Sequence, residues 1–151
     1  MHILTTILLV LLGLIALFLL AAVFMKKTYS VERSILIQKP VSEVFDYIKL
    51  LKNQNNYATW NSLDPDMKQT YSGTDGTPGF VSAWESNNKK VGAGEQEIKT
   101  VIDGAGIETE LRFLKPFEGV AQSSLLAKAV TDQQAQVVWR LDSAMKYPMN
   151  F

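Results

Sequence analysis

A run of 23 residues without a charged side chain, Ile3 to Met25, constrains this sequence more than any other feature. As a helix it would reach about 35 Å at roughly 1.5 Å per residue, and the hydrocarbon core of a bilayer is about 30 Å thick. A buried core helix of a soluble domain is a poor alternative, because the segment has no polar face. The segment therefore predicts a transmembrane helix, with the lipid bilayer as its partner through residues 3–25.

A cleaved signal peptide is the main alternative for this segment. Such a peptide normally begins with Lys or Arg, has an apolar run of about 7–15 residues and ends at small residues. Here only Met1 and His2 precede a longer run, and Ala21 and Ala22 are followed by further apolar residues. An uncleaved anchor is the favoured interpretation.

The orientation of the anchor is predicted from the lysines that follow it. Lys26 and Lys27 come directly after the apolar run, with Arg33 and Lys39 close behind. Basic flanks are usually retained in the cytoplasm, so we expect the domain on the cytoplasmic side. On the alternative interpretation the lysines only extend to phosphate headgroups, which carries no orientation.

The remainder of the chain has the composition of one ordinary domain. Of 15 basic residues, two are Lys26 and Lys27, so residues 28–151 carry 13 basic against 15 acidic residues, a net charge of −2. This balance gives no basis for nucleic-acid binding. The sequence has no cysteine, and its one histidine is His2, which excludes disulfides, thiolate metal sites and most nucleophile–base pairs. We divide the chain into an anchor with a basic flank, residues 1–27, and a domain, residues 28–151, and we expect neither metal nor cofactor.

The pattern of side chains in the domain predicts an α+β fold. Residues 28–37 alternate as a strand does, and Val41, Val44, Phe45 and Ile48 recur at helical spacing after Pro40. A second short helix is expected over residues 50–57 and a loop over 60–66. Turn residues then separate six further strands, expected at residues 68–72, 80–86, 94–102, 107–114, 119–129 and 135–143.

The predicted helices are too few to cover the apolar face of the predicted sheet. Two short helices cannot cover seven strands, and a sheet with one apolar face must bury it. The sequence ends with an apolar tail, residues 147–151. We therefore expect a C-terminally truncated domain, or one that has lost a covering helix.

Several motifs, in order, resemble those of a known family. They are Val31–Ile35, Val44–Tyr47, Trp60 with Leu63–Met67, Thr70–Gly73, Trp84–Glu85, Lys90–Gly92 with Gly94, Phe113–Phe117, Trp139 and Pro148–Met149. Over residues 29–151 the sequence resembles the SRPBCC superfamily, also called START-like or birch-pollen-allergen-like. More narrowly, it is similar to bacterial membrane-anchored proteins of the polyketide cyclase/dehydrase-like kind.

The resemblance implies a helix-grip fold: a seven-stranded antiparallel sheet with two short helices after the first strand, here preceded by one transmembrane helix. It also implies an apolar cavity. In the family a long C-terminal helix normally closes that cavity, and we expect this helix to be missing here. The implied location is the bacterial cytoplasmic membrane.

Alternation along the strands predicts which side chains face the concave side of the sheet. Glu85, Glu97 and Arg112 belong to the outer face, so their neighbours in sequence point inward. Thr100 falls in the inward set. The candidate lining residues of a cavity are Phe80, Ser82, Trp84, Gln96, Ile98, Thr109, Leu111, Phe113, Ser123, Leu125 and Trp139. The alternative is a plain sheet core whose hydroxyls bond to the backbone.

Three functions remain open at this point. The first is a membrane-tethered binding module for a small hydrophobic or lipid-like molecule, a ligand class that the resemblance implies. The second is a polyketide cyclase/dehydratase-like enzyme, with Tyr71, Asp64 or Glu97 as the acid–base group. The third is a ligand-free structural or regulatory tether. Asp64-Pro65-Asp66 has the spacing of a calcium-like site but is more typical of a turn.

Overall fold

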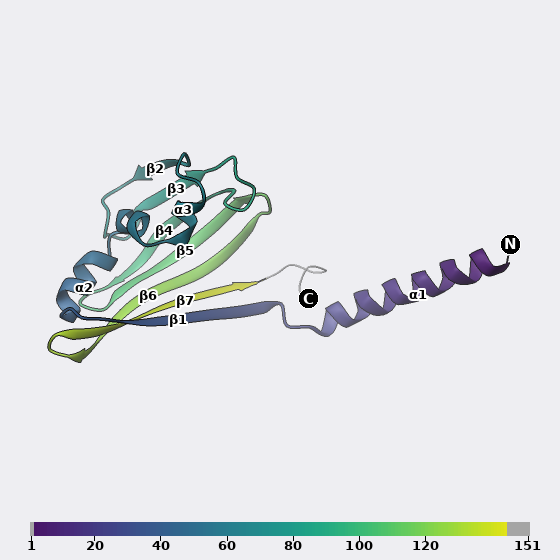
Figure 1. Ribbon diagram of the computed structural model, residues 1–151, viewed down its shortest axis with the longest axis horizontal. Coiled ribbons are helices and arrows are strands. Elements are labelled where there is room, and N and C mark those ends of the chain that lie inside the picture. Colours follow the sequence, from purple (N-terminus) through teal and green to yellow (C-terminus); the bar gives the residue numbers. More distant parts are fainter. Residues whose placement is uncertain (1, 145–151) are drawn as a thin grey trace. The chain divides into compact units, whose positions relative to one another are not determined.

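The computed structural model describes residues 2–144, which form two units that we treat separately. The first contains helix α1 (His2–Phe24), an unbroken helix of 23 residues (Figure 1). Its large apolar side chains are exposed. It is long and apolar enough to cross a membrane on grounds of length and composition. The predicted apolar tail, residues 147–151, lies outside the described residues.

The second unit, Ser30–Ser143, is built on one seven-stranded sheet in the order β1-β7-β6-β5-β4-β3-β2. Each of β2 to β7 pairs with the strand next to it in sequence as an antiparallel meander, and β1 lies beside β7. The strands are β1 (Thr28–Ile37), β2 (Lys68–Ser72), β3 (Val81–Glu85), β4 (Ala93–Ile102), β5 (Gly106–Lys115), β6 (Gly119–Thr131) and β7 (Gln134–Ala144).

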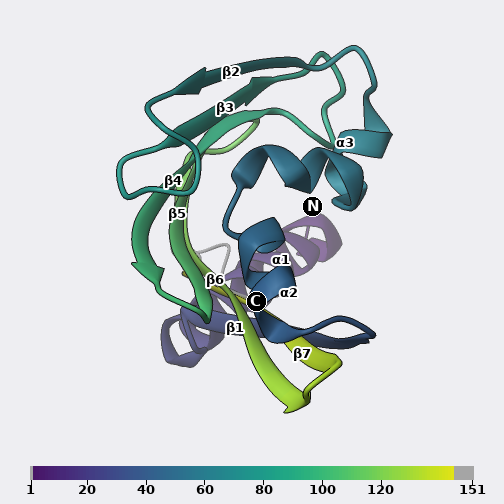
Figure 2. The same ribbon diagram turned by 90° about the vertical axis from the view of Figure 1, so that its left-hand side faces the viewer.

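Three short helical segments follow β1 and lie in the hollow of the curved sheet (Figure 2): α2 (Val41–Ile48), the 3-10 helix η1 (Leu51–Asn56) and α3 (Thr59–Leu63). Helix α2 buries Val44, Phe45 and Ile48, and packs against β5 and β6. The core includes Val44, Ile48, Leu51, Phe80, Ile98, Ile107, Leu125, Ala127, Ala135 and Val137. It occupies the part of the concave face that the helices cover.

The sequence prediction of the α+β architecture and of all seven strands is confirmed, with strand ends shifted by one or two residues. The second short helix expected over residues 50–57 is present as the 3-10 helix η1. One local prediction is wrong, because helix α3 takes up much of the loop expected over residues 60–66. The α3 segment has only five residues, too few for a hydrophobic period to identify it.

Thr100 is also placed wrongly by strict alternation. The ladder between β4 and β5 shifts register between Ile98 and Thr100, which marks a β-bulge at Lys99. The extra residue reverses the alternation, so Thr100 is exposed and Val101 packs against the core.

Candidate functional site

The predicted lining residues lie on one face of the sheet. The register aligns Ser82, Gln96 and Leu111 across β3, β4 and β5, and paired residues point to the same side. A second row aligns Ile98, Thr109 and Ser123. Because Ile98 packs in the core with the helices, this shared side is the concave face. The structure therefore brings the set together, while their role in lining a ligand site stays a prediction.

Part of this face is already covered by the domain's own helices. Phe80, Ile98 and Leu125 belong to the core cluster with side chains of α2 and η1. Thr109 and Ser123, between them, are buried polar residues. A ligand could not contact these five side chains without displacing protein atoms.

The remainder of the predicted lining is half-buried: Ser82, Trp84, Gln96, Leu111, Phe113 and Trp139. Trp84 and Phe113 meet edge-to-face with ring centroids 6.3 Å apart. Between them in the register lies Gly94, where a Cβ atom would stand 2.7 Å from the Trp84 ring. A glycine at this position lets the indole approach the β4 backbone closely, and Trp84 and Phe113 together form an apolar floor of two aromatic side chains.

One polar pair is set into this apolar surface. The Gln96 side-chain nitrogen donates a hydrogen bond of 3.0 Å to Thr109 Oγ1. Apolar walls with a few fixed polar groups are typical of small-molecule sites. None of the eleven predicted lining residues has an ionisable side chain at ordinary pH, so the set can orient a ligand but cannot act as an acid or a base.

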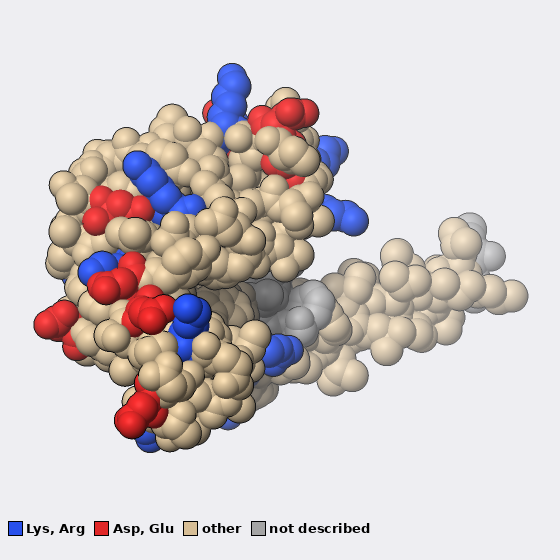
Figure 3. All heavy atoms as spheres, turned by 60° about the vertical axis from the view of Figure 1, so that its left-hand side comes forward, with Lys and Arg blue, Asp and Glu red and all other residues tan. Residues whose placement is uncertain are grey.

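Glu97 lies on the opposite, convex face, where it cannot act on a ligand in the concavity. Arg112 contacts Glu95, Glu97 and Glu110 at 2.6, 2.7 and 2.7 Å. The hydrogen bonds from Arg112 hold the pKa values of Glu97 and Glu110 below their ordinary range. Figure 3 shows basic and acidic side chains interspersed on the side of the domain that it draws. The candidate role of Glu97 in catalysis is therefore not supported by its position.

A cluster of amide side chains joins η1 to strand β2, and sequence reasoning did not identify it. Asn55 donates to Gln69 Oε1 and to the Tyr71 hydroxyl, both at 3.0 Å, and Tyr71 donates to Gln69 Oε1 at 2.8 Å. The Tyr71 ring stacks on Phe80 with centroids 6.0 Å apart. Tyr71 is thus held at the edge of the concave face with its hydroxyl engaged. The polar run at residues 53–56 was the available signal, but its partners come from a distant strand.

Two tyrosine side chains lie close together near the helical segments. The rings of Tyr47 and Tyr57 are 6.3 Å apart, and Asn56 donates to the Tyr47 hydroxyl at 3.1 Å. Burial, together with the neighbouring Tyr47, raises the pKa of Tyr57 to about 12. The Tyr57 hydroxyl is therefore not suited to lose a proton near neutral pH.

Asp64 takes part in a turn, as its sequence context indicated. The Asp66 backbone amide donates to Asp64 Oδ1 at 3.1 Å, and the Ser86 hydroxyl donates to Asp64 Oδ2. Beside it is a polar hollow of about 380 Å³, lined by Leu63, Asp64, Asp66, Lys68, Glu85, Asn87 and Asn88. This hollow contains none of the predicted lining residues.

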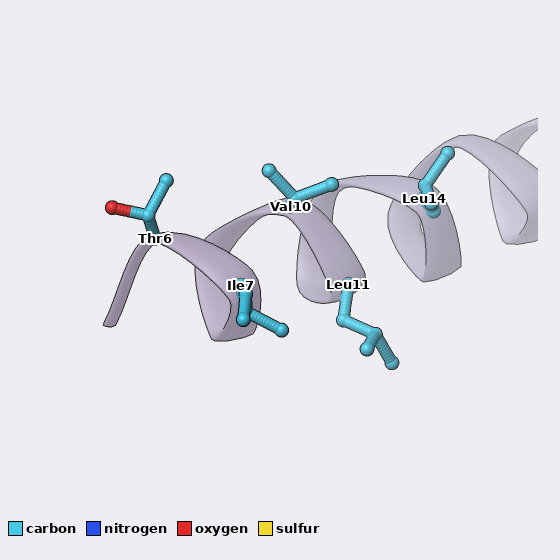
Figure 4. Close-up of a pocket in the computed structure, with 5 residues that line it drawn as sticks. All are labelled: Thr6, Ile7, Val10, Leu11 and Leu14. Carbon is cyan, nitrogen blue, oxygen red and sulfur yellow. The ribbon is translucent and has the colours of Figure 1, made fainter. Parts of the chain in front are cut away.

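A further hollow of about 210 Å³ lies along helix α1 alone. Its lining residues, Thr6, Ile7, Val10, Leu11 and Leu14, project from consecutive turns of the same helix (Figure 4). Because all of its walls come from one helix, this hollow is a furrow between side chains and not an enclosed site.

Comparison with known proteins identifies the fold. No family model matches the sequence, and none of the curated proteins matches it either. Solved structures do match. Norcoclaurine synthase from Thalictrum flavum, in complex with dopamine and hydroxybenzaldehyde, is similar with a TM-score of 0.62 at 9% identity, over 80% of this chain and 71% of that chain. The chain has the helix-grip fold of these structures.

Two other helix-grip structures match at comparable levels. Ara h 8.0201 is similar with a TM-score of 0.58 at 11% identity, and the match covers 82% of each chain. The ginseng major latex-like protein 151 from Panax ginseng is similar with a TM-score of 0.53 at 12% identity, over 82% of this chain and 87% of that chain. The fold expected from the resemblance is thereby confirmed, while identities this low carry no residue roles from these proteins to this helix-grip domain.

Proposed function

We propose that this protein is a membrane-tethered module that binds a small hydrophobic molecule on the concave face of its helix-grip domain. The observation that carries the proposal is the half-buried apolar surface around Trp84, Leu111 and Phe113, with the Gln96–Thr109 pair beside it. Burial of such side chains against a ligand contributes about 25 cal/mol per Å² of apolar surface removed from water.

The similar structures support the ligand class in general terms. One of them, norcoclaurine synthase, holds dopamine and hydroxybenzaldehyde, which are small aromatic compounds. That complex supports a fold able to accept small aromatic molecules. For this chain the proposal extends only to a small apolar or lipid-like ligand.

The tether is the apolar helix. Helix α1 meets the length and composition of a span, and we propose that it crosses the cytoplasmic membrane of a bacterial cell with the domain on the cytoplasmic side. The full chain should then remain in the membrane fraction through carbonate washing. Recovery of a soluble chain that begins after Ala22 would instead indicate a cleaved signal peptide.

A binding measurement on the full chain in detergent tests the ligand site. The probe is 1-anilinonaphthalene-8-sulfonate, whose fluorescence rises in apolar surroundings. Leu111→Gln should weaken its binding about 5- to 30-fold, because one apolar contact worth about 1–2 kcal/mol is lost. Val120→Gln is the matched control, since Val120 is an exposed apolar residue on the convex face.

Equal affinity in the wild type and the Leu111→Gln variant would contradict the concave site. An equal loss in the Val120→Gln variant would show that the probe reports general surface apolarity. The enzyme alternative has less support, because no lining residue titrates and the hydroxyl of Tyr71 is bound to amide side chains. The tether alternative predicts that no variant of the concave face changes probe binding.

A further inference from the structure

The tip of the β5–β6 hairpin exposes three large apolar side chains. Leu114, Phe117 and Val120 are 55%, 76% and 52% exposed. Val120 is paired with Arg112, so it points to the convex side. Leu114 lies at a register shift, as the extra residue between Phe113 and Lys115. Isolated apolar residues on a surface are ordinary, but three within residues 114–120 form a local patch. We call residues 114–120 the hairpin tip.

The hairpin tip lies at the end of the sheet where the chain enters the domain. Ser143 Oγ donates to the backbone oxygen of Val120 at 3.3 Å, which places the end of β7 beside the start of β6. Asp142 accepts a hydrogen bond from Ser30, which places the start of β1 beside the end of β7. Three neighbouring strands thus bring the hairpin tip to the same end of the sheet as Ser30.

The covalent connection then limits how far this end can move from helix α1. Phe24, the last residue of the helix, precedes Ser30 by six residues, and an extended chain spans at most about 3.5 Å per residue. Ser30 therefore stays within about 20 Å of the end of α1. The headgroup layer occupies about 5–8 Å of that distance on each side of the hydrocarbon core. Phe117 lies three residues beyond Val120, a further reach of about 10 Å.

The opposite end of the sheet has no such restriction. Asp132, in the turn between β6 and β7, is separated from the start of β6 by the whole 13-residue strand, about 40 Å at 3.3 Å per residue. An exposed side chain there is a natural reference position, because it belongs to the same two strands at their other end.

We propose that the hairpin tip is a second membrane contact, in which Phe117 enters the interface of the bilayer that α1 spans. The inference rests on the proposed function only in its use of α1 as the anchor. Aromatic side chains favour the headgroup level of a bilayer. Lys115, paired with Glu85 at 3.2 Å, and Glu118 flank Phe117 and limit its depth to the interface. Since the hairpin tip has no excess of basic residues, a zwitterionic lipid surface is a sufficient partner.

This contact has a consequence for the ligand site. Phe113, which belongs to the half-buried part of the concave face, is four residues from Phe117 on the same hairpin. A hairpin tip held in the interface would bring that apolar floor to the bilayer surface. A lipid-like ligand would then have a short path between the membrane and the concave face.

The absence of cysteine from the sequence permits a direct depth measurement. Single-cysteine variants of the full chain, Leu114→Cys, Asp132→Cys and Leu14→Cys, are labelled with a nitroxide and reconstituted in phosphatidylcholine vesicles. Collisions with oxygen, which concentrates in lipid, are compared with collisions with a water-soluble nickel chelate. The oxygen-to-nickel ratio at Leu114→Cys should be several-fold higher than at Asp132→Cys. Adding Phe117→Ser to Leu114→Cys should return the ratio to that of Asp132→Cys.

The controls separate failure of this inference from failure of the anchor. If Leu14→Cys is lipid-accessible while Leu114→Cys matches Asp132→Cys, the hairpin contact is wrong and the anchor stands. If the Leu114→Cys ratio stays high with Phe117→Ser, the label alone is inserting and the inference is likewise wrong. If Leu14→Cys is accessible only from water, α1 does not span and both proposals fall. Circular dichroism of each variant verifies that the domain is folded.

Discussion

Gln96 and Thr109 face each other diagonally across β4 and β5, and the Gln96 amide donates a 3.0 Å hydrogen bond to the Thr109 hydroxyl. Thr109 is only 3% exposed, so its oxygen has little access to water. The pair fixes the orientation of the one amide on an otherwise apolar part of the concave face.

Replacing Thr109 by Val keeps the shape of the side chain but removes this acceptor. We expect the free energy of unfolding to fall by about 1–3 kcal/mol, because the Gln96 amide loses a partner in a half-buried site. Urea denaturation measures the loss. Thr109→Ser, which keeps the hydroxyl, is the control and should retain more of the stability. Equal stability of the Thr109→Val variant and the wild type would show that Gln96 finds water instead.

Gly94 should not tolerate a side chain. A Cβ atom there would lie 2.7 Å from the Trp84 ring and 2.6 Å from the Arg112 backbone oxygen. We expect Gly94→Ala to cost about 1–3 kcal/mol of stability through overpacking, with a change in tryptophan fluorescence as the Trp84 indole moves. Gly119→Ala is the matched control, since a Cβ atom at that strand glycine meets nothing within 4 Å. A similar loss of stability in both variants would mean that the loss comes from strand propensity and not from the Trp84 contact.

Asp75 holds the start of the 3-10 helix η1 from a turn between β2 and β3. Its two carboxylate oxygens accept hydrogen bonds from the backbone amides of Leu51 and Lys52, at 2.8 and 3.0 Å. Asp75→Ala should lower the free energy of unfolding by about 0.5–2 kcal/mol, the usual cost of losing such a cap. Asp75→Asn keeps one acceptor, so its melting temperature should lie between those of the wild type and the Asp75→Ala variant. An Asp75→Ala variant with wild-type stability would assign the position of η1 to Leu51 packing alone.

The Arg112 network predicts a pH dependence of stability. Hydrogen bonds from Arg112 lower the pKa values of Glu97 and Glu110 in the folded protein. Groups with lowered pKa values contribute stability above their unfolded value, about 4.3 for Glu, and that contribution is lost as pH falls through the folded values. Arg112→Gln should therefore lower Tm at pH 7, and the difference from wild type should shrink below about pH 4. A difference that is independent of pH would point to lost packing of the arginine side chain.

The orientation of the domain is tested in intact cells. Because Lys26 and Lys27 follow the span, protease added outside should leave the domain whole until the cells are permeabilised. A Lys26→Gln, Lys27→Gln double variant should increase the fraction that is digested. Digestion of the wild type without permeabilisation would reverse the predicted orientation.

Much of the fold was accessible from sequence because its signals are local. Strand alternation and turn residues located β1 to β7, and the spacing of Val44, Phe45 and Ile48 located α2. The Lys99 bulge was not accessible, because it depends on how β4 pairs with β5 rather than on β4 alone.

The candidate site was predicted less completely. Alternation assigned the lining side chains to one face, but it could not show which of them the helices cover. Phe80 and Ile98 are covered and Leu111 is half-exposed, a difference set by where α2 and η1 pack. The contacts of Asn55 with Gln69 and Tyr71 join residues at least 14 apart in the chain, beyond any local pattern.

The place of β1 at the edge of the sheet affects how the protein is made. Of the seven described strands, this one leaves the ribosome first, but its neighbour in the sheet is β7, which leaves last of the seven. Until residues 134–144 have been synthesised, β1 has no partner, although it is the strand next to the anchor. Closing such a long-range pair is slow and leaves an unpaired strand edge in the meantime. If the chain is anchored during synthesis, β1 stays unpaired close to the membrane until β7 has been made. Pairing of β1 with β7 would then take place near the bilayer surface.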